Sequence, residues 1–116
     1  MDEEIPTYRK PGIEKQIADI TGDEGRVRIL GTLITKDDTG AVSIDDNTGI
    51  IDVFFNDFEI VEKLSEISQG DPVRVIGRTN KTPEGDIEIH GETIEKLNNF
   101  DFHLWKKIRK LEKEGV

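Results

Sequence analysis

Apolar and polar residues alternate along several short stretches of this chain, which predicts a protein built largely of β-strands. The clearest stretch is 42–55, where two alternating runs flank a cluster of Asp, Asn and Gly residues. Period-two alternation on both sides of such a cluster indicates a β-hairpin with one buried face. Because the turn fixes the register, we expect Ile51, Val53 and Phe55 in the core and Phe54 on the opposite face.

The same alternation predicts three more strands, at residues 26–34, 73–78 and 87–97. Gly31 lies in the middle of the first of them and suggests a sharp bend at a barrel corner. The run from Phe58 to Ile67 has apolar residues on adjacent turns, so we predict a short amphipathic helix with Asp57 as its N-cap. Residues 13–20 have helical spacing, and form either a helix or a helical turn leading into an extended piece over the barrel end.

Residues 100–114 carry the one long helical pattern, an apolar stripe with basic residues around it. The stripe consists of Leu104, Trp105, Ile108 and Leu111. Residues 1–12 show no apolar periodicity, and we expect a flexible arm there. The predicted organisation is therefore an N-terminal arm (1–12), a β-domain (13–98) and a C-terminal helix (99–116).

The predicted order is three strands, a short helix, two strands and a terminal helix. This is the arrangement of an all-β, five-stranded OB-fold barrel with a C-terminal α-helix, and OB folds often bind oligonucleotides. The chain has 116 residues, no cysteine and a formal net charge of −9. It is long enough for one modest core, and disulfides and thiolate metal sites are excluded. A protein that binds nucleic acid alone usually carries a basic excess, so binding here needs a local basic patch or a partner.

Four segments resemble the small OB-fold subunits of archaeal replication protein A: RKPGIEKQIADI (9–20), RVRILGTLI (26–34), SIDDNTGIIDVFF (43–55) and GDPVRVIGR (70–78). The resemblance implies a subunit that joins larger replication protein A-type subunits in a hetero-oligomer on single-stranded DNA, through its C-terminal helix. It also implies a role in DNA replication and repair and a cytoplasmic, nucleoid-associated location.

Binding of a single strand by an OB fold requires aromatic rings for the bases and a cationic groove for the backbone. We expect either Phe54 or Phe55 to provide the ring. The cations expected to contact phosphates are Arg28, Lys36, Arg74, Arg78 and Lys81. Alternatively, the arginines solvate the barrel or pair with acids, and Phe54 is covered. Relatives that bind strongly have a second aromatic on the fifth strand, where this chain has no Phe, Tyr or Trp, so we expect weak intrinsic affinity.

The stripe that contains Trp105 either folds back on the barrel or meets helices of other subunits, and the resemblance favours the second role, in which Trp suits an interface anchor. We expect no enzymatic activity, no cofactor and no metal, because His90 and His103 are not in metal-ligand spacing and no nucleophile–base constellation appears. No segment suggests contact with a membrane. Two other functions stay open: an assembly module with little direct DNA contact, and an RNA-binding OB domain.

Overall fold

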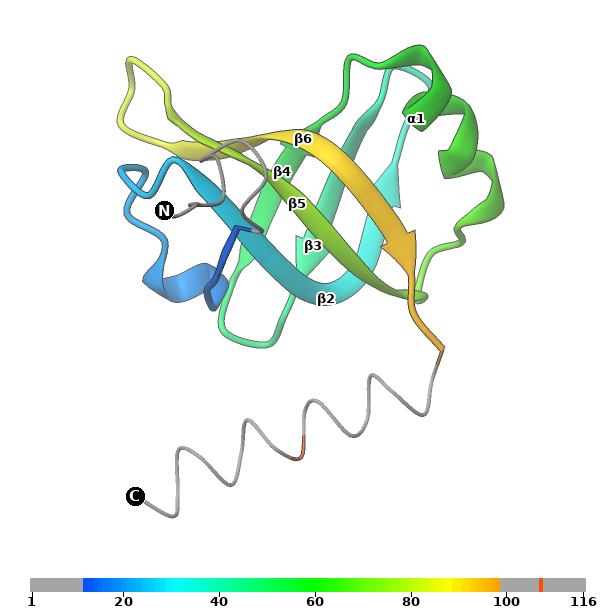
Figure 1. Ribbon diagram of the computed structural model, residues 1–116, viewed down its shortest axis with the longest axis horizontal. Coiled ribbons are helices and arrows are strands. Elements are labelled where there is room, and N and C mark those ends of the chain that lie inside the picture. The colour runs from blue at the N-terminus through cyan, green and yellow to red at the C-terminus, as the bar shows by residue number, and fades with distance from the viewer. Residues whose placement is uncertain (1–11, 99–106, 108–116) are drawn as a thin grey trace, which may run out of the picture.

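Five β-strands close into a barrel in the computed structural model, which describes residues 12–98 and Lys107 (Figure 1). The strands are β2 (Arg26–Lys36), β3 (Ala41–Asp45), β4 (Ile50–Phe54), β5 (Pro72–Lys81) and β6 (Ile87–Lys96). Short elements complete the described part: strand β1 (Ile13–Glu14), helix α1 (Phe58–Lys63), and the 3₁₀ turns η2 (Ile17–Asp19) and η3 (Leu64–Glu66).

The barrel closes because β2 pairs with strands on both of its sides. Around the barrel the strands follow the order β2, β3, β4, β6 and β5, and β5 pairs again with β2. All these pairings are antiparallel except that of β4 with β6, which is parallel. In consequence β4 lies across the barrel from the contact between β2 and β5, as Figure 1 shows.

Strand β2 changes partner near Gly31, as the sequence predicts. Residues 26–32 pair with β5, whereas residues 32–36 pair with β3. A Cβ atom at Gly31 would lie 2.7 Å from the carbonyl oxygen of Asp45 and 2.8 Å from a methyl carbon of Ile44. Glycine therefore allows β2 to bend while the neighbouring backbone stays close.

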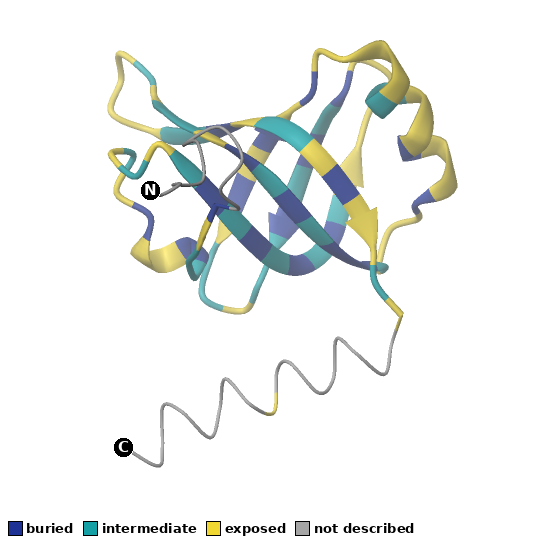
Figure 2. Ribbon diagram, viewed as in Figure 1, coloured by how far each residue is buried: buried dark blue, intermediate teal, exposed yellow. Residues whose placement is uncertain are grey.

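The core is aliphatic, with one aromatic ring among its largest side chains. The inward residues of every barrel strand are buried, in the alternating pattern visible in Figure 2. The predicted hairpin is confirmed, since Ile51, Val53 and Phe55 are buried whereas Phe54 lies on the outer face. Within residues 12–98 no polar or charged residue is fully buried.

The predicted helix is confirmed as α1 followed by η3. The Asp57 carboxylate accepts a hydrogen bond of 2.8 Å from the backbone N–H of Glu59 and so caps the helix. Leu64 and Ile67, which lie in sequence between β4 and β5, are buried and belong to the core of the barrel. Residues 13–20 are not one helix. They form β1, parallel to β2, and then η2, so the structure contains both an extended piece and a helical turn, but in the opposite order to the predicted one.

The described residues form an OB fold: a closed five-stranded barrel with one short helix between its third and fourth strands. The predicted C-terminal helix (99–116) lies outside the described residues apart from Lys107, which is exposed, and so do residues 1–11 of the predicted arm. Among the described residues, no helix is long and apolar enough to span a bilayer.

Candidate nucleic-acid interface

Phe54 ends β4, the third strand of the barrel, and Phe55 follows it; the two side chains point in opposite directions. Phe55 is only 1% exposed, whereas Phe54 is 36% exposed. The prediction that Phe55 is one of two candidates for stacking is therefore corrected: its ring is packed in the core and has no face free for a base. Phe54 is the aromatic residue of this pair that a ligand can reach.

His90 on β6 lies beside Phe54. The two residues are register partners in the parallel pairing of β4 with β6, and partners in register project to the same side of a sheet. The His90 side chain is 54% exposed, and its Nε2 atom lies 3.3 Å from Glu88 Oε1. Bases stack on His as well as on Phe, Tyr and Trp. Sequence analysis missed His90 as a binding residue, because its position beside Phe54 depends on a pairing between distant strands.

A shallow groove of about 280 Å³ runs from Phe54 towards the β2–β3 turn. Asp37 organises this turn, since its carboxylate accepts hydrogen bonds from the Thr39 hydroxyl, at 2.7 Å, and from the backbone N–H of Ala41, at 3.1 Å. The hydrogen bonds from Thr39 and Ala41 lower the pKa of Asp37, which keeps the carboxylate ionised. The groove beside Phe54 therefore has the Asp37 carboxylate at one end, next to Lys36.

The three candidate arginines lie on β2 and β5, on the outer surface, and Arg78 is the register partner of His90. Each forms an ion pair: Arg28 with Glu14 at 3.4 Å, Arg78 with Glu92 at 3.5 Å, and Arg74 with Glu95. Glu92 has two arginine partners, because Arg26 also contacts it, at 2.9 Å. Glu92 is the extra residue of a bulge where the register of β6 shifts against β5, between the pairs Ile76–Thr93 and Gly77–Gly91. The arginines thus share the outer surface of β2 and β5, as predicted. Arg28 and Arg74 lie away from Phe54, whereas Arg78 lies beside His90.

The two candidate lysines also have partners. Lys36 Nζ donates hydrogen bonds to the carbonyl oxygens of Leu64, at 2.7 Å, and Ile67, at 2.6 Å. It thereby satisfies carbonyl groups at the end of the short helix, a common role for Lys. Lys81 pairs with Asp23 at 3.4 Å, and both side chains are largely exposed.

Charge on the barrel is mostly negative, and its cations are largely paired. Residues 12–98 contain 19 acidic and nine basic side chains, a net charge of −10. Seven of these nine cations form ion pairs within the same range. No group of three or more His, Asp or Glu residues that could hold a metal ion occurs in the described part of the chain. The predicted partner-interface residues, Leu104, Trp105, Ile108 and Leu111, lie outside the described residues, and their role stays a prediction.

The barrel and the helix between its third and fourth strands define an OB-fold domain, and OB folds often bind oligonucleotides. The chain belongs to the family of OB-fold nucleic acid binding domains, which matches it over residues 24–97. No curated protein sequence matches the chain.

Solved structures of low sequence identity share the fold. A chain of the S. pombe Stn1–Ten1 complex superposes with a TM-score of 0.60 and 22% identity, covering 77% of this chain and 71% of that chain. A chain of a replication protein A heterotrimer bound to single-stranded DNA has a TM-score of 0.57 and 20% identity, with 72% of this chain and 66% of that chain covered. The mitochondrial single-stranded DNA binding protein Rim1 from S. cerevisiae has a TM-score of 0.57 and 16% identity, with 64% and 93% covered.

Proposed function

We propose that this chain binds single-stranded DNA through Phe54 and His90, as a small subunit of a replication protein A-like complex. The observation that carries the proposal is the register of β4 against β6, which sets two exposed rings side by side on the outer face. Stacking of a base on such a ring is worth about 1–3 kcal/mol and needs no particular sequence. Membership of a nucleic acid binding family supports the proposal.

The intrinsic affinity of the chain is weak. Phosphate contacts need cations, and most cations of residues 12–98 are already paired with carboxylates. Larger subunits therefore supply most of the affinity, and the apolar stripe around Trp105 attaches this chain to them. The structural likeness to a chain of a replication protein A heterotrimer is consistent with this role. The complex acts in DNA replication and repair, in the cytoplasm and associated with the nucleoid.

The test is an NMR titration of the full chain with oligo-dT in low salt, compared with oligo-rU. Amide shifts at Phe54 and His90 that weaken as salt is added are expected, because release of counterions accompanies phosphate contacts. Equal affinity for both oligonucleotides would instead favour a domain that does not distinguish RNA from DNA. Shifts that avoid β4 and β6 altogether would contradict the proposed face.

A second function is an assembly module with little direct DNA contact, and the net charge of −10 over residues 12–98 favours it. The oligo-dT titration of the isolated wild-type chain separates the two roles, and replacing Trp105 and Ile108 by Asp tests the attachment that both require. Under both, the double variant no longer co-purifies with the partner subunit while the barrel stays folded. Under the assembly role, however, the isolated wild-type chain gives no shifts with oligo-dT. A barrel that unfolds in the variant would indicate that the stripe packs on its own domain.

A further inference from the structure

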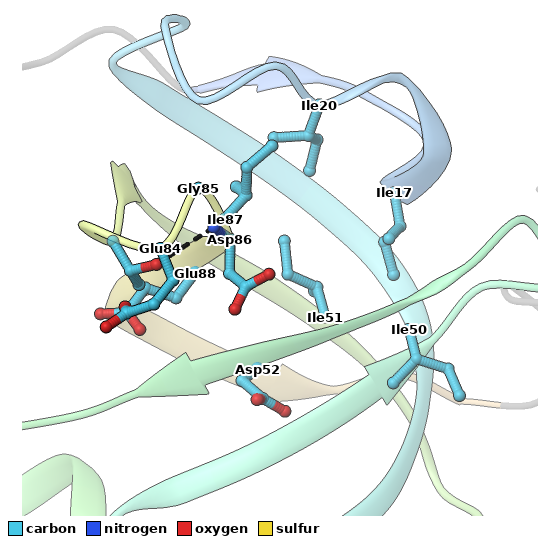
Figure 3. Close-up of a pocket in the computed structure, with 11 residues that line it drawn as sticks. Ile17, Ile20, Ile50, Ile51, Asp52, Glu84, Gly85, Asp86, Ile87 and Glu88 are labelled. Atoms are coloured by element: carbon cyan, nitrogen blue, oxygen red, sulfur yellow. Dashed lines mark hydrogen bonds between the residues drawn. The ribbon is translucent and has the colours of Figure 1, made fainter.

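A groove of about 600 Å³ separates η2, β4 and the β5–β6 hairpin, and its floor is made of isoleucines (Figure 3). Ile17, Ile20 and Ile51 are nearly buried, and Ile87 is half-buried. Ile50 is 62% exposed, which is unusual for a large aliphatic side chain at the edge of a barrel. The groove therefore offers apolar surface that the described residues leave uncovered.

Carboxylates form the rim of this groove. Asp52 comes from β4, Glu84 and Asp86 from the hairpin turn, and Glu88 from β6, and Figure 3 shows them around the isoleucine floor. No Lys or Arg is among the described residues that line the groove. Asp52 accepts a hydrogen bond of 2.9 Å from the Ser43 hydroxyl, and Glu88 contacts His90 and Asn80. Within residues 12–98, Asp52, Glu84 and Asp86 form no ion pair.

This rim differs from the outer surface of β2 and β5. There acids meet cations, as in the pairs of Glu92 with two arginines and of Asp71 with Lys96. In the groove, like charges converge over an apolar floor, where low-dielectric walls focus their field. Such a surface repels phosphates and attracts cations. Charge complementarity thus excludes a nucleic acid backbone and favours a cationic ligand that also carries apolar groups.

We propose that the groove binds a basic peptide segment of a partner protein, in which Lys or Arg residues are interspersed with aliphatic residues. The aliphatic side chains cover Ile50 and the floor, and the cations meet Asp52, Glu84, Asp86 and Glu88 at the rim. Apolar burial supplies affinity, while the charges set the partner and the rate of association. This inference does not rest on the proposed DNA binding, because neither Phe54 nor His90 lines the groove; the two faces adjoin where His90 contacts Glu88 of the rim.

The test uses the full chain and a synthetic peptide of Leu and Lys with its Leu residues on one helical face. The control is the same peptide with Glu in place of Lys. We expect amide shifts at residues 50–52 and 84–88 with the Lys peptide and none with the Glu peptide. Shifts confined to Phe54 and His90, or no shifts, would overturn the groove proposal. An oligo-dT titration of the same sample reports separately on the proposed DNA face.

Paired charge reversals decide whether the rim is specific. Glu84→Lys with Asp86→Lys changes the rim, and Glu59→Lys with Glu66→Lys makes the same change of net charge on α1 and η3, at exposed positions outside the groove. We expect the first pair to weaken peptide binding about ten-fold or more and the second about two-fold or less. Equal losses would show that the peptide responds only to net charge, and would overturn the proposal.

The chain has a basic segment of its own, with Lys106, Lys107, Arg109 and Lys110 close together in sequence. Replacing these four residues by Ser tests whether this segment fills the groove. Under the proposal, the amide signals of residues 50–52 and 84–88 are unchanged by the replacement in the absence of peptide. A change there would assign the groove to the chain itself and overturn the assignment to a partner.

Discussion

Gly91 on β6 lies directly against the ring of Phe55, the residue that follows β4. A Cβ atom at Gly91 would lie 2.6 Å from Phe55 Cδ1 and 2.7 Å from Phe55 Cζ. The absence of a side chain at Gly91 thus makes room for the buried ring. With Phe55 held in the core, the alternation of the strand sends Phe54 to the outer face, beside His90. One glycine therefore contributes to the placement of the proposed stacking pair.

Replacing Gly91 by Ala should lower the free energy of unfolding by about 1–3 kcal/mol, because the new methyl group overlaps a ring that cannot move without disturbing the core. Urea unfolding measures the loss. Gly49→Ala is the control, since its nearest contact would be a methyl carbon of Ile17 at 3.1 Å, a milder overlap. An equal or smaller loss at Gly91 would show that the Phe55 ring has room to shift.

The neighbouring phenylalanines should respond to truncation in opposite ways. Phe55→Ala removes a buried ring and should cost about 3–5 kcal/mol of stability. Phe54→Ala should leave the melting temperature nearly unchanged and lower the affinity for oligo-dT about ten-fold, the loss of one stacking contact. Thermal melting and fluorescence anisotropy measure the two quantities. Full oligo-dT affinity in the Phe54 variant would remove that ring from the proposed interface.

Much of the barrel could be predicted because its signals are local. Alternation identified the strands, Gly31 marked the bend in β2, and the residues around Asp57 marked the start of α1. The opposite orientations of Phe54 and Phe55 follow from the same alternation. These features depend on residues within a few positions of each other, where turn chemistry and side-chain period decide the structure.

Features that depend on contacts between distant segments were not predicted. The place of His90 beside Phe54 comes from a parallel pairing of strands separated by α1 and β5. The bulge at Glu92, which serves two arginines, comes from a shift in register. Neither has a signature within its own strand. The acidic groove likewise gathers residues from η2, β4 and the β5–β6 hairpin, so no single segment indicates it.

Lys36 was expected to contact phosphates. In the structure its ammonium group instead donates hydrogen bonds within the domain. Replacing Lys36 by Met keeps the aliphatic stem and removes the two hydrogen bonds to the carbonyl groups of Leu64 and Ile67. We expect a loss of about 1–3 kcal/mol in urea unfolding, because hydrogen bonds of charged groups are stronger than neutral ones. Affinity for oligo-dT should stay within about two-fold of the wild type. A stable variant with weaker DNA binding would instead restore the phosphate-binding role.

The arginines of β2 and β5 test whether cations that are already paired with carboxylates contribute to DNA binding. Replacing Arg28, Arg74 and Arg78 together by Ala should change oligo-dT affinity less than Phe54→Ala does, because each of these cations is already paired with a carboxylate. Stability should fall by at most about 1 kcal/mol for each exposed pair. Anisotropy at several salt concentrations is the measurement. A shallower salt dependence in the triple variant would mean that the strand crosses β2 and β5.

The loop before β2 is held by one carboxylate. Glu24 accepts hydrogen bonds from the backbone N–H groups of Thr21, at 2.8 Å, and Gly22, at 3.0 Å, and pairs with Lys15 at 3.1 Å. Burial alone would raise the pKa of Glu24, but these hydrogen bonds together lower it from 4.5 to about 2.

Because the pKa of Glu24 is lower in the folded than in the unfolded chain, the carboxylate stabilises the fold above pH 4.5 and loses this effect as the pH falls towards 2. Glu24→Gln should therefore cost about 1–3 kcal/mol at pH 7, where the charged hydrogen bonds are fully formed. Urea unfolding of both proteins across this range should show the difference shrinking as the pH falls below 4.5. Asp37 and Asp71, whose pKa values are also lowered, contribute equally to both proteins and cancel. A difference in the free energy of unfolding that stays constant as the pH falls towards 2 would mean that the charge of Glu24 does not stabilise the loop.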